Sequence, residues 1–287
     1  QLLDQQGQRN ANSMCFGQED VPDLAFEKAR IIYNFGADFL ETWGRPVENA
    51  RRLSESNAFD GKTKTELVHL SPHVSLTGAK ADRWVVINPG SEAMVALSIA
   101  SVIRDQKGGY DFLSGMLAAF APEKVAEATG VPAEKMKELA QKFIDNSPGL
   151  ALGGGPSSRN SNLTSLHVAI NILNAVSGNL GKTVFFHDQP APENTSHHNL
   201  VQLIKDLEAG KVELLIVDDS DPLHALPNST GIKEALKNTF TVSLASQKND
   251  TSSEADLQLP ALTDYESWGD AFPRSGVRSI RQPVMAP

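Results

Sequence analysis

The sequence predicts an α/β protein made of two doubly wound, mostly parallel sheets flanked by helices. Short apolar runs alternate with longer segments of helical periodicity, and this alternation occurs in two separate series along the chain. The apolar runs are too continuous for strands with one face in water, so we expect them to be buried on both faces. With 287 residues, the chain is also longer than one average domain and can form two cores.

The first series runs from about Phe26 to Asp105. Its predicted strands are Arg30–Phe35, Glu66–Leu70 and Trp84–Ile87. A helix is expected to begin near Ser91 and to be buried, because most of its sides are apolar. Residues 54–65 are rich in Ser, Asn, Lys and Gly, which is typical of a solvated loop.

Two helices lead to the second series. Pro122–Thr129 is ended by Gly130, and the apolar residues of Pro132–Asp145 fall on one stripe. The second series begins with a strand at Leu150–Leu152, three glycines and a helix from about Asn160 to Ser177. The later predicted elements are a helix at Asn199–Ala209, a strand at Val212–Val217, a helix at Thr230–Lys237 and strands at Phe240–Leu244 and Leu257–Leu259.

The composition excludes several classes of function. A net charge of −9 argues against a nucleic-acid partner, because phosphate binding needs clustered Lys and Arg. No apolar run reaches about 18 residues, so we expect no direct membrane insertion. The single cysteine, Cys15, excludes an internal disulfide and an iron-sulfur cluster held within this chain, since such clusters usually take four thiolates.

Five loops follow predicted strands where open α/β sheets bind ligands. They are Gly36-Ala37-Asp38, Leu70-Ser71-Pro72-His73, Pro89-Gly90-Ser91-Glu92, Gly153-Gly154-Gly155 and Asp218-Asp219-Ser220-Asp221-Pro222. Glycine lets the backbone approach a phosphate closely, helix N-termini favour anions, and a carboxylate accepts hydrogen bonds from ribose or guanine. Together the loops indicate a nucleotide-bearing cofactor, whereas each glycine alone is also typical of a simple turn.

Residues 151–183 carry the most specific pattern. They combine the glycine run, the helical segment Ala169–Asn174 and the turn Ser177–Lys182. This order resembles a segment of the molybdopterin oxidoreductases of the dimethyl-sulfoxide-reductase superfamily, in which a glycine run precedes N-x-L-N-A-x-x-G-N-x-G. Further similar stretches are Thr129–Pro132, Pro89–Glu92 (Pro-Gly-Thr-Asp in the family), Ser220–Pro222 (Asn-Pro) and Ala255–Ala261 (A-D-x-x-L-P). The resemblance covers nearly everything from residue 21 to the C-terminus.

Three stretches carry a narrower resemblance. Phe35–Trp43, Ser75–Trp84 and Tyr265–Asp270 are similar to the molybdopterin-like iron-sulfur subunit of alternative complex III, a quinol-oxidising assembly. This resemblance implies iron-sulfur and membrane subunits as partners, together with further domains of the same polypeptide. It also implies a location on the periplasmic side of the bacterial inner membrane, with the cytoplasm as the alternative. In that branch the fold occurs without the metal cofactor.

The broader resemblance implies molybdopterin guanine dinucleotide as the cofactor. The residues that we expect at the cofactor site are Gly36, Asp38, Ser71, His73, Gly90, Ser91, Glu92, Gly154, Gly155, Asn179, Asp219 and Asp221. Active members have an acidic residue and often Arg where this chain has Ser71 and His73, and Asn where it has Asp221. A carboxylate near a pyrophosphate is electrostatically unfavourable unless a cation intervenes. We therefore expect lost or weakened cofactor binding, and we assign no catalytic residue and no metal ligand.

Other polar residues have two readings each. His187 with His197-His198 is a candidate metal site, but adjacent side chains seldom point together, so a surface loop is favoured. Glu266 and Asp270 are a candidate acid/base pair, against the favoured alternative of a structural turn around Trp268. His73 and His167 are candidate donors to cofactor phosphates, against the commoner role of a hydrogen-bonded core or rim histidine.

We expect an N-terminal extension over residues 1–20, a first Rossmann-like lobe over 21–115 and a second lobe over 116–287 that is truncated at its C-terminal end. The absence of an initial Met and the final run Gln282–Pro287 lead us to expect a piece of a longer polypeptide.

The first functional hypothesis is a scaffold domain in a respiratory electron-transfer complex. The alternative is part of an active molybdenum bis-guanylyl-pterin oxidoreductase whose cluster and capping domains lie outside this chain. A third hypothesis is a stand-alone nucleotide-binding protein.

Overall fold

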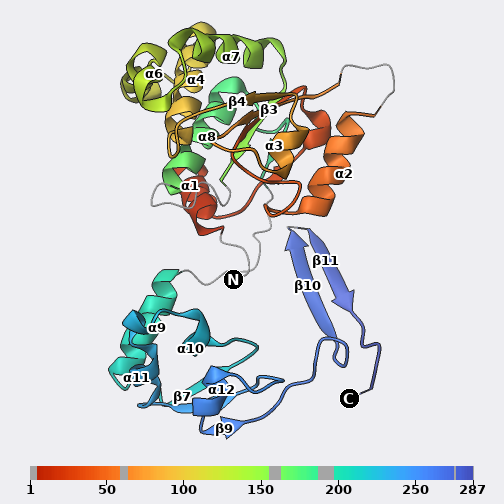
Figure 1. Ribbon diagram of the computed structural model, residues 1–287, viewed down its shortest axis with the longest axis vertical. Coiled ribbons are helices and arrows are strands. Elements are labelled where there is room, and N and C mark those ends of the chain that lie inside the picture. Colours follow the sequence, from red (N-terminus) through yellow and green to blue (C-terminus); the bar gives the residue numbers. More distant parts are fainter. Residues whose placement is uncertain (1–4, 59–63, 155–162, 187–196, 275, 287) are drawn as a thin grey trace. The chain divides into compact units, whose positions relative to one another are not determined.

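The computed structural model describes residues 5–58, 64–154, 163–186, 197–274 and 276–286. The chain divides into two compact units, Gln1–Pro190 and Ala191–Pro287. Each unit contains one parallel sheet with helices beside it, as Figure 1 shows. This arrangement confirms the predicted α/β class. Within the described ranges, no helix is long and apolar enough to cross a membrane.

The division between the units corrects the boundary expected between residues 115 and 116. Strand β5 (Gly149–Gly153) pairs with β2 (Ile31–Phe35), so both sides of the expected boundary contribute to one sheet. Helix α1 (Gln6–Phe16) also belongs to this unit and packs against α8 (Leu163–Ser177). The predicted N-terminal extension is therefore part of the first compact unit.

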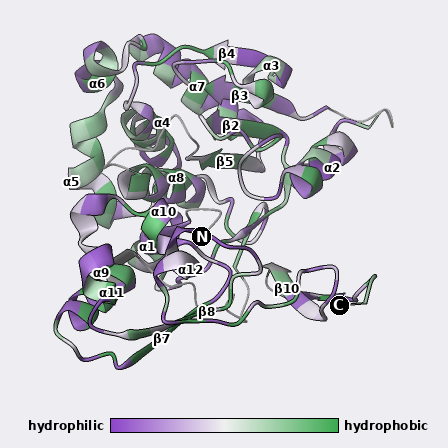
Figure 2. Cartoon of the chain, turned by 60° about the horizontal axis from the view of Figure 1, so that its bottom comes forward, coloured by the Kyte–Doolittle hydropathy of each residue, from purple (hydrophilic) through white to green (hydrophobic). Residues whose placement is uncertain are grey.

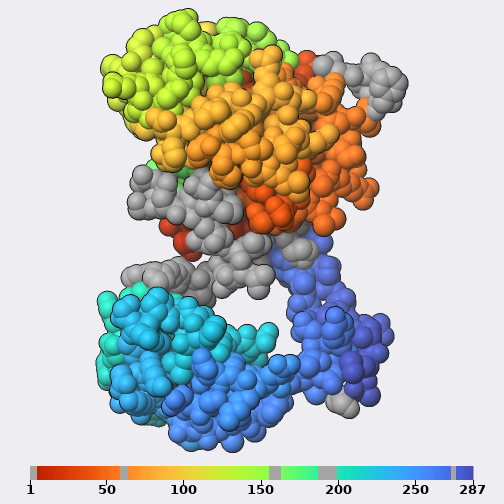
Figure 3. Space-filling view, in the orientation of Figure 1, coloured from red at the N-terminus to blue at the C-terminus, as the bar shows by residue number. Residues whose placement is uncertain are grey.

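Unit 1 is the larger of the two and holds most of the candidate loops. Besides α1, β2, β5 and α8, its elements are β1 (Asp23–Leu24), η1 (Phe26–Lys28), α2 (Pro46–Ser56), β3 (Glu66–Leu70), α3 (Leu76–Lys80), β4 (Arg83–Val85), α4 (Glu92–Lys107), η2 (Asp111–Leu113), α5 (Ser114–Leu117), η3 (Ala118–Phe120), α6 (Pro122–Thr129), α7 (Ala133–Asp145) and β6 (Val184–Phe185). The region from α2 to α4, orange in the space-filling view, forms much of the visible surface of this unit (Figure 3).

The sheet of unit 1 has the order β4-β3-β2-β5, and all of its pairs are parallel. Alternate residues of β2 point to opposite faces. Tyr33 and Phe35 belong to a core cluster with α4, α7 and α8, whereas Ile32 belongs to a second cluster that includes Leu53 of α2. Both faces are covered, which explains why the strands read as continuous apolar runs.

Unit 2 contains the parallel sheet β7-β8-β9. Its elements are α9 (His197–Glu208), β7 (Leu214–Val217), α10 (Pro222–Ala225), η5 (Asn228–Thr230), α11 (Ile232–Leu236), β8 (Phe240–Ser243), α12 (Asp250–Glu254), β9 (Leu257–Gln258) and the hairpin strands β10 (Gly269–Arg274) and β11 (Val277–Arg281). Its core includes Leu207 of α9, Ala235 of α11 and, partly buried, Leu215 of β7. Strand β7 is hydrophobic along its whole length (Figure 2).

Several elements were absent from the sequence prediction. These are the helices α1, α2 and α3 and the hairpin β10–β11. Helix α2 extends to Ser56 and so replaces the first residues of the predicted loop over 54–65. The order and type of the longer predicted elements are as the structure has them, because their apolar periodicity is strong.

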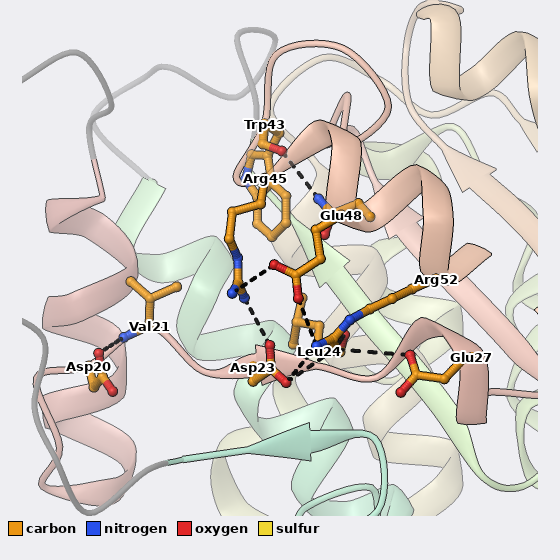
Figure 4. Close-up of polar contacts among 10 residues, drawn as sticks. Asp20, Val21, Asp23, Leu24, Glu27, Trp43, Arg45, Glu48 and Arg52 are labelled. Carbon is orange, nitrogen blue, oxygen red and sulfur yellow. Dashed lines mark hydrogen bonds and ion pairs between the residues drawn. The ribbon is translucent and has the colours of Figure 1, made fainter. Parts of the chain in front are cut away.

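A cluster of ion pairs holds α2 against β1 (Figure 4). Asp23 accepts from Arg45 Nη2 at 2.9 Å and from Arg52 Nη1 at 3.1 Å, and Arg52 also donates to the Leu24 carbonyl at 2.8 Å. Glu48 pairs with Arg52 at 2.8 Å. Burial alone would raise the pKa of Asp23, but the two arginines lower it below its usual value. The cluster fixes the segment that follows the β2 loop.

Replacing Asp23 with asparagine is expected to reduce the free energy of unfolding by about 1–3 kcal/mol, because the largely buried Arg45 and Arg52 lose one of the two carboxylates that they share. Urea unfolding measures this change. The matched control is Glu55→Gln in α2, the helix that also contains Arg52. The exposed ion pair of Glu55 with Arg51 at 3.0 Å is expected to contribute less than about 0.5 kcal/mol. Equal effects of the two substitutions would contradict a stabilising role for this cluster.

Candidate functional site

The loops that follow β2, β3, β4 and β5 lie at one edge of the unit 1 sheet, because parallel strands end together. We call this edge the carboxyl edge. Asn34, near the end of β2, accepts from the Ala37 N–H at 2.9 Å and donates to the Ala37 carbonyl at 2.7 Å. Gly36 has a φ of +79°, which glycine adopts without strain. The turn after β2 is thus fixed by the strand's own side chain.

Asp38 ties the β2 loop to the start of α3. Its Oδ1 accepts from the Thr77 N–H at 2.9 Å and from the Thr77 hydroxyl at 2.5 Å. The side chain is buried, which would raise its pKa, but the hydrogen bonds from Thr77 outweigh burial and lower it. This carboxylate is therefore engaged inside the protein.

A buried polar group lies behind the β3 loop. Asn34 faces His69 Nδ1 at 3.1 Å, and His69 Nε2 lies 3.3 Å from the His73 carbonyl. Because the Asn34 oxygen already accepts from Ala37, its amide nitrogen donates to His69, so His69 Nδ1 accepts and Nε2 carries the proton. Burial lowers the pKa of His69, in keeping with this neutral form.

Ser71 and His73 lie close together in this loop. Ser71 is fully buried, and its hydroxyl oxygen accepts weakly from the His73 N–H at 3.4 Å. The Ser71 carbonyl accepts from the Trp84 indole N–H at 2.9 Å. The His73 side chain is exposed at the edge of the sheet. Of this pair, His73 is therefore the exposed residue and Ser71 the buried one.

The loop after β4 turns at Gly90, whose φ is +78°, and leads into α4. Ser91 donates its hydroxyl to the Asn88 carbonyl at 2.6 Å. Glu92, the first residue of α4, is only 3% exposed, and its Oε1 has no hydrogen-bond partner in the described chain. Burial raises the pKa of Glu92, while the N–H groups of Glu92 and Gly90 and the nearby His73 oppose the rise.

The glycine run after β5 allows a close contact with α8. Gly154 has a φ of +84°, and a Cβ at this position would lie 2.6 Å from His167 Nε2. His167 is 6% exposed, and burial lowers its pKa to about 4. It is therefore a neutral core histidine, the favoured of its two predicted roles. Gly155 lies outside the described residues.

Asn179 is not part of the carboxyl edge. Its Oδ1 accepts from the Gly149 N–H at 3.2 Å, at the opposite end of β5, and its amide donates to Asn174 at 3.0 Å. Asn174 in turn bonds both backbone groups of Ala151, at 3.0 and 2.8 Å. These two asparagines thus provide hydrogen-bond partners for backbone groups on the outer edge of β5. The motif that suggested cofactor binding thus contains residues that terminate the sheet.

Asp219 and Asp221 lie in unit 2, after β7. Asp219 is exposed, with a φ of +42°. Asp221 accepts from the Thr251 N–H at 3.0 Å and hydroxyl at 2.5 Å, and from the Asp250 N–H at 3.2 Å. Burial would raise the pKa of Asp221, but these hydrogen bonds lower it. Asp221 therefore connects the starts of α10 and α12.

The remaining candidates form no second site in the described chain. Glu266 accepts from the Thr263 N–H at 2.9 Å and hydroxyl at 2.8 Å, which gives it a structural part in its turn. The side chains of His187 and His197-His198 lie outside the described residues. Cys15 lies in α1, and burial raises the pKa of its thiol. No group of three or more metal-ligating side chains occurs among the residues searched.

The carboxyl edge does not fit a cofactor that carries a pyrophosphate. None of its described candidate residues has a permanent positive charge, and two of them are carboxylates. Asp38 is engaged by Thr77, and the first N–H groups of α4 already face the carboxyl of Glu92. The glycine turns that the cofactor needs are present, whereas the charges are not complementary to it.

Comparisons with known proteins give the family context. The chain is 26% identical over 294 residues to the menaquinone reductase molybdopterin-binding-like subunit of Nitratidesulfovibrio vulgaris, covering 94% of this chain and 42% of that protein. It is 25% identical over 186 residues to dimethyl sulfoxide reductase DmsA of Haemophilus influenzae, covering 54% and 23%. No family model matches the sequence.

The structure of acetylene hydratase from Pelobacter acetylenicus superposes with a TM-score of 0.72 at 17% identity, over 98% of this chain and 47% of that one. This likeness concerns the fold. The chain spans less than half the length of these relatives. The predicted resemblance to molybdopterin oxidoreductases is confirmed, and the narrower resemblance to alternative complex III stays a prediction.

Proposed function

We propose that this chain is a molybdopterin-oxidoreductase-like domain of a quinol-oxidising electron-transfer complex, in which it serves as a scaffold with lost or weakened cofactor binding. One observation carries the proposal: the carboxyl edge keeps the family's glycine turns, but none of its described candidate residues has a permanent positive charge to pair with a pyrophosphate. Asp38 is engaged by Thr77, and its carboxylate adds a negative charge near this edge. A scaffold domain requires the fold but does not require positive charges that complement a pyrophosphate.

The proposal places this chain among other subunits. Relatives named as subunits include the menaquinone reductase protein and subunit alpha of an F420-dependent formate dehydrogenase of Methanococcus maripaludis. Iron-sulfur and membrane subunits are the proposed partners, together with further domains of the same polypeptide. The proposed location is the periplasmic side of the inner membrane.

The second candidate function is an active molybdenum oxidoreductase. It is favoured by relatives such as the arsenate respiratory reductase molybdopterin-containing subunit of Shewanella sp., which is 29% identical over 97 residues. In that case the turns at Gly36, Gly90 and Gly154 would let the protein backbone approach the cofactor closely. The metal of the cofactor would supply the redox chemistry. His73, the exposed side chain at this edge, would then be a cofactor contact.

Metal analysis of the full-length protein separates the two functions. The protein is produced in a host that makes guanylyl pterin, and molybdenum, tungsten and extractable pterin are measured per chain. We expect far less than one equivalent of each, because the carboxyl edge repels the pyrophosphate. A molybdenum enzyme purified from the same host is the positive control. Stoichiometric molybdenum or tungsten with guanylyl pterin would overturn the scaffold function.

A further inference from the structure

The two faces of the parallel sheet β7-β8-β9 in unit 2 differ in what covers them. One face lies against α9 and α11, since Leu215 of β7 packs against the core cluster that contains Leu207 and Ala235. Successive residues of a strand point to opposite faces, so Leu214 and Ile216 point to the other face. Their register partners on β8, and through them residues of β9, lie on this second face as well.

The second face is apolar throughout, and we call it the bare face. Its residues are Leu214, Ile216, Phe240, Val242, Leu257 and Leu259. Val242, in the central strand between Ile216 and Leu257, is buried, whereas the other five are 41–58% exposed. Single exposed apolar residues are ordinary on a protein surface, but a contiguous row of them across three strands is typical of a contact surface.

A bare face is unusual for this kind of sheet. Parallel sheets occur almost only with both faces covered by helices. The sheet of unit 1 follows this rule, since Tyr33 and Ile32 of β2 belong to core clusters on opposite faces. The axes of three neighbouring strands span about 10 Å, which matches the diameter of one helix with its side chains. One helix with an apolar side is therefore enough to cover the bare face.

The chemistry of the bare face and the length of the relatives indicate where this helix comes from. The bare face has no charged or hydrogen-bonding side chain. Transient interfaces are about as polar as the rest of a protein surface, so a transient partner does not fit it. The matched region makes up 42% of the menaquinone reductase subunit and 47% of acetylene hydratase, so more than half of each relative lies outside it.

We propose that an amphipathic helix from a part of the same polypeptide outside residues 1–287 docks its apolar side on the bare face. The inference rests on the proposed function, which counts further domains of the polypeptide among the partners, and it names the surface that one of them contacts. The rival occupants are a second copy of this chain, another subunit and a segment within residues 1–287.

Hydroxyl-radical footprinting of the full-length protein tests whether the bare face is covered. Phe240 on the bare face and Phe112 in η2 are the same residue type, and their exposed fractions of 51% and 82% alone predict oxidation rates that differ by less than about twofold. Because a docked helix buries the bare face, Phe240 is expected to be oxidised at least about fivefold more slowly than Phe112. Mass spectrometry measures both rates in one sample.

Photo-cross-linking identifies what covers the bare face. Phe240 is replaced by the photo-reactive p-benzoylphenylalanine in the full-length protein, and the cross-linked peptides are mapped by mass spectrometry. The expected partner peptide lies outside residues 1–287, in a product with the mass of a single polypeptide. The matched control carries the same photo-reactive residue at Phe112 and is expected not to cross-link to this peptide. If the Phe240 variant does not fold, Leu259, at the margin of the bare face, takes its place.

Oxidation of Phe240 within about twofold of that of Phe112 would overturn the proposal, because the bare face would then be open to solvent. It would also be overturned by the lack of a cross-link, or by a cross-link to a second copy, to another subunit or within residues 1–287. The same peptide cross-linked from Phe112 would have the same consequence. Failure here is distinct from failure of the scaffold function, which is decided by the metal content of the unmodified protein.

Discussion

Replacing Asn174 with leucine is expected to lower the free energy of unfolding by about 2–4 kcal/mol, because a buried N–H and a buried C=O each lose their partner. The Asn174 oxygen accepts from the Ala151 N–H at 3.0 Å, and its amide donates to the Ala151 carbonyl at 2.8 Å. Leucine has a similar volume, so the loss reports on hydrogen bonds more than on packing. Urea unfolding followed by circular dichroism measures it.

Asn10→Leu is the control for this prediction. Asn10 is exposed, and its side-chain oxygen accepts from Gln6 at 2.7 Å. Its replacement is expected to change stability by less than about 0.5 kcal/mol. If the loss of stability in Asn174→Leu were equally small, the outer edge of β5 would not depend on this side chain. The asparagine would then be free for another role.

Acid is expected to destabilise the protein through His167. The pKa of this buried imidazole is about 4 in the folded protein against 6.5 as the ordinary value, so the unfolded chain binds a proton more readily between these pH values. The stabilisation is present in full above about pH 6.5 and is lost as the pH falls toward 4. The difference corresponds to about 3 kcal/mol.

The measurement compares urea unfolding at pH 7 and pH 4.5 in the unmodified protein and in His167→Asn, which cannot titrate here. The variant is expected to lose less stability across this interval. His224→Asn is the control, because His224 is 79% exposed at its side chain. The same pH dependence in all three proteins would show that His167 does not carry the effect.

Sequence reasoning located the carboxyl edge but not its internal hydrogen bonds. The loops after β2, β3, β4 and β5 were predicted from the ends of apolar runs, and Gly36, Gly90 and Gly154 all have positive φ there. Asn34 and His69 were missed, although a polar residue inside an otherwise apolar strand was a usable signal. The contact between them joins β2 to β3, and no local pattern reveals such a contact.

The sequence by itself determined the α/β class, the order of the longer elements and the position of the glycine turns, because these depend on local periodicity and backbone freedom. Only the tertiary structure decided which polar groups remain available to bind a ligand and which are engaged within the protein. It places Asn179 at the opposite end of β5, engages Asp221 with Thr251 and buries Glu92 against the start of α4. Each result depends on which segments meet in space, and that is fixed by the packing of the whole core.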